Sequence, residues 1–193
     1  GESSRAAIRA YGEALELDDN LVSGYNNRGV AWQALGDAQE MRGGDPRDAY
    51  REAVLDYDRA LDRRPDFLDA LANRGIADIG LGRALFVRGG DPREACEAAI
   101  ADAGAVIAAA PSHWMSCNVR ADALLLLGES ESYRGVDPRE RYRAAIADLE
   151  AALSLRPDFS AALGNLWRSW LSLGDAEGAR GGDPEPLFRK ALE

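Results

Sequence analysis

One six-residue segment occurs four times in this chain at a constant spacing. Its copies read RGGDPR, RGGDPR, RGVDPR and RGGDPE, and they begin at residues 42, 88, 134 and 180. The spacing is therefore 46 residues, and three further prolines share it: Pro65, Pro111 and Pro157. A fixed period of 20–50 residues is typical of solenoids and repeat arrays. The period predicts a stack of similar units and argues against a single compact core.

Each unit contains two segments with helical periodicity. Segment 46–64 has apolar residues three or four positions apart, as on one face of an amphipathic helix. These residues are Tyr50, Ala53, Val54, Tyr57, Ala60 and Leu61. The preceding segment, 21–42, has a looser pattern of the same kind, and no segment shows the sustained alternation of a strand. We therefore expect an all-α chain of helix pairs.

Each copy of the six-residue segment predicts the end of one helix and the start of the next. In the first copy, Arg42 suits the negative end of a helix, and Gly43 and Gly44 can adopt the left-handed conformation that ends helices. Asp45 can cap the next helix, and Pro46 fits its first position. A phosphate-binding reading of the glycines lacks the Gly-Lys-Ser/Thr that must follow.

Four further glycines, also 46 residues apart, leave two alternatives open for the first helix of each unit. They are Gly36, Gly82, Gly128 and Gly174. The helix either continues through the glycine, at a cost of about 1 kcal/mol relative to alanine, or breaks there before a short extra turn. We favour the continuous helix.

The pattern resembles the tetratricopeptide repeat (TPR), whose signature is Trp-x2-Leu-Gly-x2-Tyr, then Ala-x3-Phe, then Pro over 34 residues. The first full unit matches it at Tyr25, Arg28, Gly29, Trp32, Ala53, Tyr57, Ala60 and Pro65. The corresponding positions of the later units follow the same spacing, so the resemblance covers the whole chain. The unit here is 12 residues longer than in the family, which indicates that both helices are longer.

The resemblance implies a right-handed α-solenoid of antiparallel helix pairs. We expect a single array over residues 1–193 with one partial unit before four others, at roughly 1–19, 20–65, 66–111, 112–157 and 158–193. Because the array begins and ends within a unit, we expect it to be a fragment of a longer protein.

In the family the first helix of each unit lines a concave face that binds peptides, and asparagines there contact the main chain of the ligand. An amide suits this role because it both donates and accepts hydrogen bonds. The ligand-binding residues that the resemblance implies here are Asn26, Asn27, Val30, Gln33, Asp69, Asn73, Ile76, Asn118, Asp122, Asn165 and Arg168. Packing between helices is the alternative role for the asparagines.

The charge balance limits the classes of partner. The formal net charge is −10 and the isoelectric point is about 4.7, so a basic footprint for nucleic acid is missing. We expect a module that binds a protein or peptide, with basic and apolar ligand residues favoured. The alternative is a spacer that self-associates through its terminal helices. In bacteria such arrays often accompany enzyme domains, so regulation of an attached enzyme is a wider role that the resemblance implies.

No pattern indicates catalysis. His113 is the only histidine, so the chain offers no evident metal cluster or serine triad, and we expect no enzyme activity, metal or cofactor. The longest apolar runs are too short to span a membrane. Cys96 and Cys117 fall on neighbouring antiparallel helices but too far apart for a disulfide, which favours a reducing, cytoplasmic location.

Overall fold

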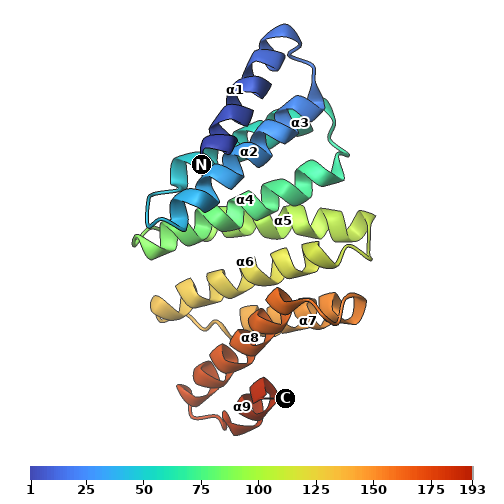
Figure 1. The fold of residues 1–193 in the computed structure, drawn as a ribbon. Helices are drawn as coiled ribbons and strands as arrows, with labels where there is room; N and C mark the ends of the chain where they lie inside the picture. The colour runs from blue at the N-terminus through green and yellow to red at the C-terminus, as the bar shows by residue number, and fades with distance from the viewer. Residues whose placement is uncertain (193) are drawn as a thin grey trace. The chain divides into compact units, whose positions relative to one another are not determined.

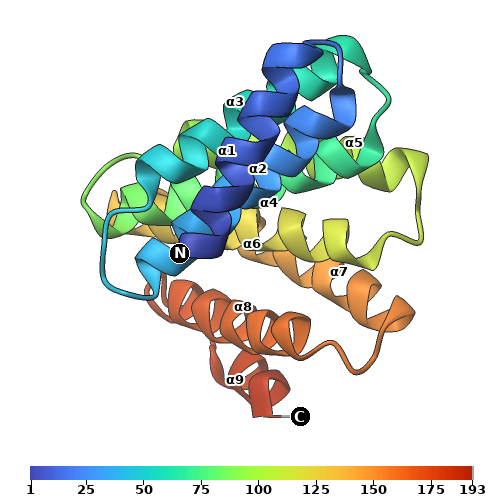
Figure 2. The same ribbon diagram turned by 45° about the horizontal axis from the view of Figure 1, so that its top comes forward.

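The computed structural model describes residues 1–192, and these residues form α-helices joined by short loops, with no strand among them (Figure 1). The helices divide between two compact units, residues 1–90 and residues 91 onward. Each helix runs antiparallel to the next one along the chain within its unit (Figures 1 and 2). The fold is all-α, as the periodicity predicted.

The first unit contains four helices. They are α1 (Glu2–Leu17), α2 (Val22–Glu40), α3 (Arg47–Arg63) and α4 (Leu68–Val87). The second unit contains α5 (Arg93–Ala109), α6 (Trp114–Tyr133), α7 (Arg139–Leu155), α8 (Ser160–Gly178) and α9 (Glu185–Leu192). We call the even-numbered helices A helices and the odd-numbered helices B helices, because they correspond to the first and second helix of each predicted pair.

The A helices run without a break through the four interior glycines, so the continuous alternative is correct. Contacts with the B helices explain two of these glycines, Gly36 and Gly128. A Cβ atom on Gly36 would lie 2.8 Å from the ring of Tyr50, and one on Gly128 would lie 2.6 Å from the ring of Tyr142. Gly36 and Gly128 thus let a buried tyrosine of the B helix lie directly against the A-helix backbone. The close contact offsets the low helix propensity of glycine.

The loops between A and B helices have one conformation in all four copies. The first glycine of each copy has a positive φ, 72° at Gly43, and its N–H donates to the carbonyl of Glu40 at 2.9 Å. The N–H of Gly44 donates to the carbonyl of Gln39 at 2.8 Å, which completes a Schellman motif. Contrary to our expectation, the second glycine of the segment, such as Gly44, does not have a positive φ. This explains why a valine, Val136, can replace it in the third copy.

The next helix starts one residue later than predicted. Helix α3 begins at Arg47, and the carboxylate of Asp45 accepts a hydrogen bond from the Arg47 N–H at 3.2 Å. Asp91, Asp137 and Asp183 accept equivalent bonds two residues ahead, at 3.0–3.2 Å. The predicted acidic cap is therefore present, while the proline occupies the capping position itself.

The predicted apolar face of α3 is buried against α2 and α4. Tyr50, Tyr57 and Ala60 are at most 2% exposed. The ring of Tyr57 packs on Gly29, where a Cβ atom would lie 2.7 Å away. Small residues on A helices and large ones on B helices therefore fit together at two places in this pair.

Candidate interaction surface

The predicted asparagines of the first unit contact one another across two neighbouring A helices. The Nδ2 of Asn73, on α4, donates to the Oδ1 of Asn26, on α2, at 3.2 Å. The Nδ2 of Asn26 in turn lies 3.4 Å from the Oδ1 of Asn27. Asn27 is exposed and Asn73 is half-buried. The three amides form a continuous chain that keeps further donor and acceptor capacity, since each amide has two donors and two acceptor lone pairs.

The second unit repeats this contact and adds an ion pair. The Nδ2 of Asn165, on α8, donates to the Oδ1 of Asn118, on α6, at 3.2 Å. Three residues after Asn165, the Arg168 guanidinium donates to the carboxylate of Asp122, which lies four residues after Asn118, also at 3.2 Å. Asp122 is only 8% exposed. In both units, neighbouring A helices therefore contact each other through a pair of asparagine amides. In the second unit an arginine–aspartate ion pair lies beside the amides.

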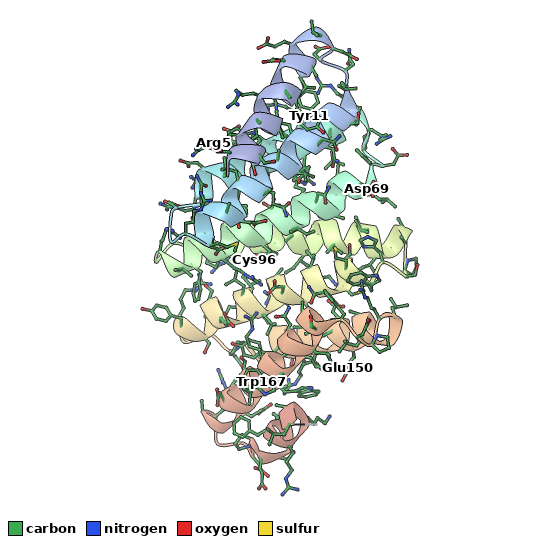
Figure 3. The ribbon with its side chains drawn as sticks, in the orientation of Figure 1. Arg5, Tyr11, Asp69, Cys96, Glu150 and Trp167 are labelled. Carbon is green, nitrogen blue, oxygen red and sulfur yellow. The ribbon has the colours of Figure 1, made fainter. Side chains whose placement is uncertain are left out.

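The other predicted residues differ in their surroundings. Val30 is 44% exposed on α2. Asp69 is exposed in the first turn of α4 (Figure 3), and Ile76 is half-buried further along that helix. Gln33 faces the B helix, because its Oε1 accepts from the Tyr57 hydroxyl at 3.3 Å. The structure thus brings together the amides, but it engages Gln33 in packing between α2 and α3.

Buried ion pairs fix α2 against α3 and α6 against α7, and the sequence analysis missed them. The Arg28 guanidinium binds the Asp56 carboxylate through two bonds of 2.7 Å. Arg120 binds Asp148 in the same way at 2.7 and 2.6 Å. Asp56 is fully buried, and its hydrogen bond is the largest cause of the raised pKa of Arg28. The signal was an arginine and an aspartate 28 residues apart, which recur two 46-residue periods later in the second pair.

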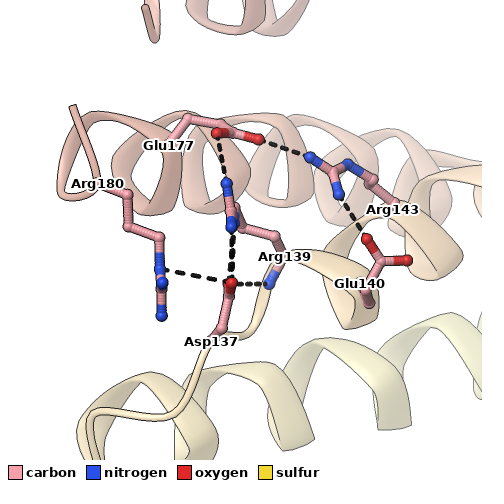
Figure 4. Close-up of polar contacts among 6 residues, drawn as sticks. All are labelled: Asp137, Arg139, Glu140, Arg143, Glu177 and Arg180. Atoms are coloured by element: carbon pink, nitrogen blue, oxygen red, sulfur yellow. Dashed lines mark hydrogen bonds and ion pairs between the residues drawn. The ribbon is translucent and has the colours of Figure 1, made fainter. Parts of the chain in front are cut away.

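Further ion pairs lie at the loop edge of the second unit (Figure 4). Arg139, at the start of α7, binds Asp137 at 2.7 Å and Glu177 of α8 at 2.9 Å. Arg143 binds the other oxygen of Glu177 at 2.6 Å, and Arg180 lies 3.5 Å from Asp137. The hydrogen bond from Arg139 lowers the pKa of the Asp137 carboxyl from 3.8 to about 2. These contacts join the end of α8 to the start of α7.

The arginine of one RGGDP copy contacts the aspartate of the preceding copy within each unit. Arg88 lies 3.6 Å from Asp45 in the first unit, and Arg134 binds Asp91 at 3.1 Å in the second. In both cases the two residues are 43 positions apart. The repeated segment therefore links successive loops in addition to ending and starting helices.

Comparison with known proteins concerns the fold. No family model and no curated protein matches the chain. Among solved structures, the MamA RS-1 ArsTM double mutant aligns with a TM-score of 0.63 at 19% identity, over 99% of this chain and 84% of that one. MamA 41-end from Desulfovibrio magneticus RS-1 aligns with a TM-score of 0.62 at 19% identity, over 98% and 84%. This chain has a TPR-like helical repeat fold.

A third similar structure carries the repeat name itself. YrrB, described as a TPR protein with an unusual peptide-binding site, aligns over 84% of this chain and 83% of that one at 21% identity. Its TM-score is 0.31, which is too low to support any argument about a site.

Residues 1–192 contain no group of three or more histidine, cysteine, aspartate or glutamate side chains placed to hold a metal ion. Within the same range, none of the helices is both long and apolar enough to cross a membrane. Cys96 and Cys117 are both buried, and burial raises the pKa of the Cys117 thiol.

Proposed function

We propose that the chain is a protein–protein interaction module whose A helices bind an extended peptide or a partner segment. The observation that carries the proposal is the pairing of amides on neighbouring A helices, Asn26 with Asn73 and Asn118 with Asn165. An extended main chain presents alternating N–H and C=O groups, and a row of amides can bind both. The A-helix faces also hold the apolar and charged residues that would select side chains.

The expected ligand has apolar and basic residues. Val30 is exposed beside Asn27 on α2, so an apolar ligand side chain packed on it would remove further apolar surface from water. Asp69 is exposed near the start of α4 and favours a cation. The overall charge of −10 acts in the same direction, because it attracts basic segments and repels acidic ones.

The test is a peptide-display selection on the wild-type chain and on an Asn27→Ala, Asn73→Ala, Asn165→Ala triple variant. Asn20→Ala is the matched control, because Asn20 is an exposed amide in the loop before α2, away from the A-helix contacts. Circular dichroism and urea unfolding establish that all three proteins are folded.

We expect enriched peptides to bind the triple variant at least tenfold more weakly than the wild type, which is about 1.4 kcal/mol. The control should bind like the wild type. Equal binding by the triple variant, or no enrichment with any of the proteins, would contradict the proposed surface.

A further inference from the structure

Tyr50 of α3 and Tyr142 of α7 occupy equivalent places in the two units, but their hydroxyl groups differ in bonding. They stand two 46-residue periods apart, and the ring of each packs on the interior glycine of its A helix. The Tyr50 hydroxyl donates to the Asp37 carboxylate at 2.8 Å and lies 3.3 Å from an oxygen of Glu40. Within residues 1–192 no hydrogen bond reaches the Tyr142 hydroxyl, although this tyrosine is only 3% exposed. A polar group buried this deeply normally has a partner, so the Tyr142 hydroxyl requires an explanation.

The sequence accounts for the difference between the two hydroxyl groups. Glu129 stands in the second unit where Asp37 stands in the first. Arg168 of α8 takes the place of Ile76 of α4, and its Nε lies 3.6 Å from the Glu129 carboxylate. The arginine therefore competes with the tyrosine for this carboxylate, and the tyrosine hydroxyl is left without it.

Tyr142, Glu129 and Arg168 thus come from three helices and form no hydrogen bond with one another. The Nε of Arg168 is buried, whereas the Glu129 side chain is 33% exposed. The Tyr142 oxygen also reaches the surface, because it is not one of the fully covered side-chain atoms that lack a partner within residues 1–192. The hydroxyl and the carboxylate are therefore both accessible to a ligand.

The charges around the Tyr142 hydroxyl are mainly negative. Burial, followed by the carboxylates of Glu129 and Glu131, raises its pKa to about 12, and Asp175 makes a smaller contribution in the same direction. Arg168 acts in the opposite direction. Three carboxylates therefore act on this hydroxyl against one arginine, and their field favours a cation.

Two of these four charged groups already have hydrogen-bond partners. Arg168 donates to Asp122 at 3.2 Å, and Glu131 accepts from an arginine of α7, also at 3.2 Å. The carboxylates of Glu129 and Asp175 accept no hydrogen bond from another side chain of residues 1–192. The unbalanced negative charge therefore lies on these two residues, one on α6 and one on α8.

We propose that Tyr142, Glu129 and Asp175 form a site for one basic side chain, a lysine or an arginine, of the polypeptide ligand. The cation donates to the Glu129 carboxylate and to the Tyr142 oxygen, which accepts hydrogen bonds as well as donating them. Asp175 adds electrostatic attraction. That the ligand is a polypeptide rests on the proposed function, and the basic residue is the feature that the second unit selects. The first unit lacks this site, because the Tyr50 hydroxyl is already bonded to Asp37.

The probe is the tripeptide acetyl-Gly-Arg-Gly-amide, and acetyl-Gly-Gln-Gly-amide is its uncharged comparator. Binding to the whole chain is followed by NMR with tyrosine isotope-labelled at Cζ, because the signal of this atom responds to hydrogen bonding of the hydroxyl. The spectra of Tyr142→Phe and Tyr50→Phe identify the two signals. We expect the arginine peptide to shift the Tyr142 signal saturably and to leave the Tyr50 signal in place, and the glutamine peptide to shift neither.

Variants with matched controls locate the binding, which is then followed through the backbone amide signals of α8. Glu129→Gln should weaken binding of the arginine peptide at least tenfold, because it removes the charge of the main acceptor. Tyr142→Phe should weaken it at least threefold, because it removes one hydrogen-bond acceptor and no charge. Glu150→Gln removes an exposed carboxylate elsewhere on α7 (Figure 3), and both it and Tyr50→Phe should bind like the wild type. Circular dichroism of each variant confirms that it folds.

The amide surface of the proposed function is tested separately. The Asn27→Ala, Asn73→Ala, Asn165→Ala triple variant should bind the arginine tripeptide like the wild type, because none of these amides belongs to the site. Tripeptide binding without any enriched peptide in the display selection would refute the amide surface and leave this site in place. Enriched peptides together with no tripeptide binding would refute this site alone.

Three results would overturn the inference. The first is the absence of a saturable shift of the Tyr142 signal with the arginine peptide, since the hydroxyl would then be bonded to water alone. The second is equal binding of the arginine and glutamine peptides. The third is wild-type affinity in either Glu129→Gln or Tyr142→Phe, which would place the binding elsewhere on the acidic surface.

Discussion

The ion pair between Arg28 and Asp56 should contribute strongly to the stability of the first unit. The two side chains are 18% and 0% exposed and share two hydrogen bonds of 2.7 Å. Removing one member of a buried pair costs about 3–5 kcal/mol, because the other charge is left without its partner. In Arg28→Leu the Asp56 carboxylate keeps a bond of 2.8 Å from Arg59. We therefore expect a loss of about 3 kcal/mol, at the low end of that range.

The free energy of unfolding is measured by urea denaturation followed by circular dichroism at 222 nm. Arg51→Ala is the matched control, because Arg51 pairs with Asp48 at 3.0 Å while the two side chains are 51% and 96% exposed. An exposed pair of this kind contributes about 0–1 kcal/mol. The double variant Arg28→Leu, Asp56→Leu should lose less than the sum of the two single variants, because it leaves no unpaired buried charge.

The reasoning fails if Arg28→Leu costs no more than the Arg51→Ala control. It also fails if the double variant loses the full sum of the single changes, since the two side chains would then stabilise the unit independently. The comparison requires that the free energy of unfolding falls with urea concentration at the same slope in all variants, because this slope reports the surface exposed on unfolding.

Three further predictions concern glycines and one carboxylate. Gly36→Ala should lower the free energy of unfolding, measured by urea denaturation, by about 1–3 kcal/mol through overpacking. Gly164→Ala should raise it by up to about 1 kcal/mol, because its added Cβ has no neighbour within 4 Å. Equal effects of the two changes would contradict the packing argument. Gly43 has a φ of 72°, a conformation that an alanine adopts only with strain. Gly43→Ala should therefore lower the midpoint of thermal unfolding more than Gly44→Val does, and the reverse order would contradict the loop assignment. The Asp137 pKa of about 2 lies below its ordinary 3.8, so its contribution to the stability of the fold is complete above pH 3.8 and is lost as the pH falls through about 2. Asp137→Asn should flatten the dependence of stability on pH in this range, as measured by acid unfolding. An unchanged pH dependence would contradict the assignment.

The sequence predicted the helix pairs because their signals are local. Tyr50 and Tyr57 lie at helical spacing, and the loop chemistry of Gly43 and Asp45 depends only on near neighbours in the chain. The choice at Gly36 required tertiary information, since the reason for the glycine is the ring of Tyr50, which is 14 residues away. Local propensity disfavours a helix there, and packing outweighs it.

The ion pairs and the amide contacts show a different limit. Arg28 and Asp56 were visible as separate members of the repeat, but their pairing depends on how α2 and α3 face each other. Asn26 and Asn73 are 47 residues apart, one more than the period, so a search at the period alone aligns Asn73 with Asn27. The residue one position earlier forms the bond, because adjacent A helices contact each other with this offset.

Comparison of repeated positions separates residues that hold the helices together from residues free to serve a ligand. The A–B contact keeps its arginine and aspartate in both pairs, Arg28 with Asp56 and Arg120 with Asp148. The arginine position itself reads Arg28, Arg74, Arg120 and Leu166, and the position two residues later changes its chemistry and reads Val30, Ile76, Asp122 and Arg168. Packing between A and B helices does not impose one residue type there, since Val30 is 44% exposed and Asp122 pairs with Arg168. A ligand of the first unit would therefore meet apolar groups at this position, whereas a ligand of the second unit would meet a charged pair.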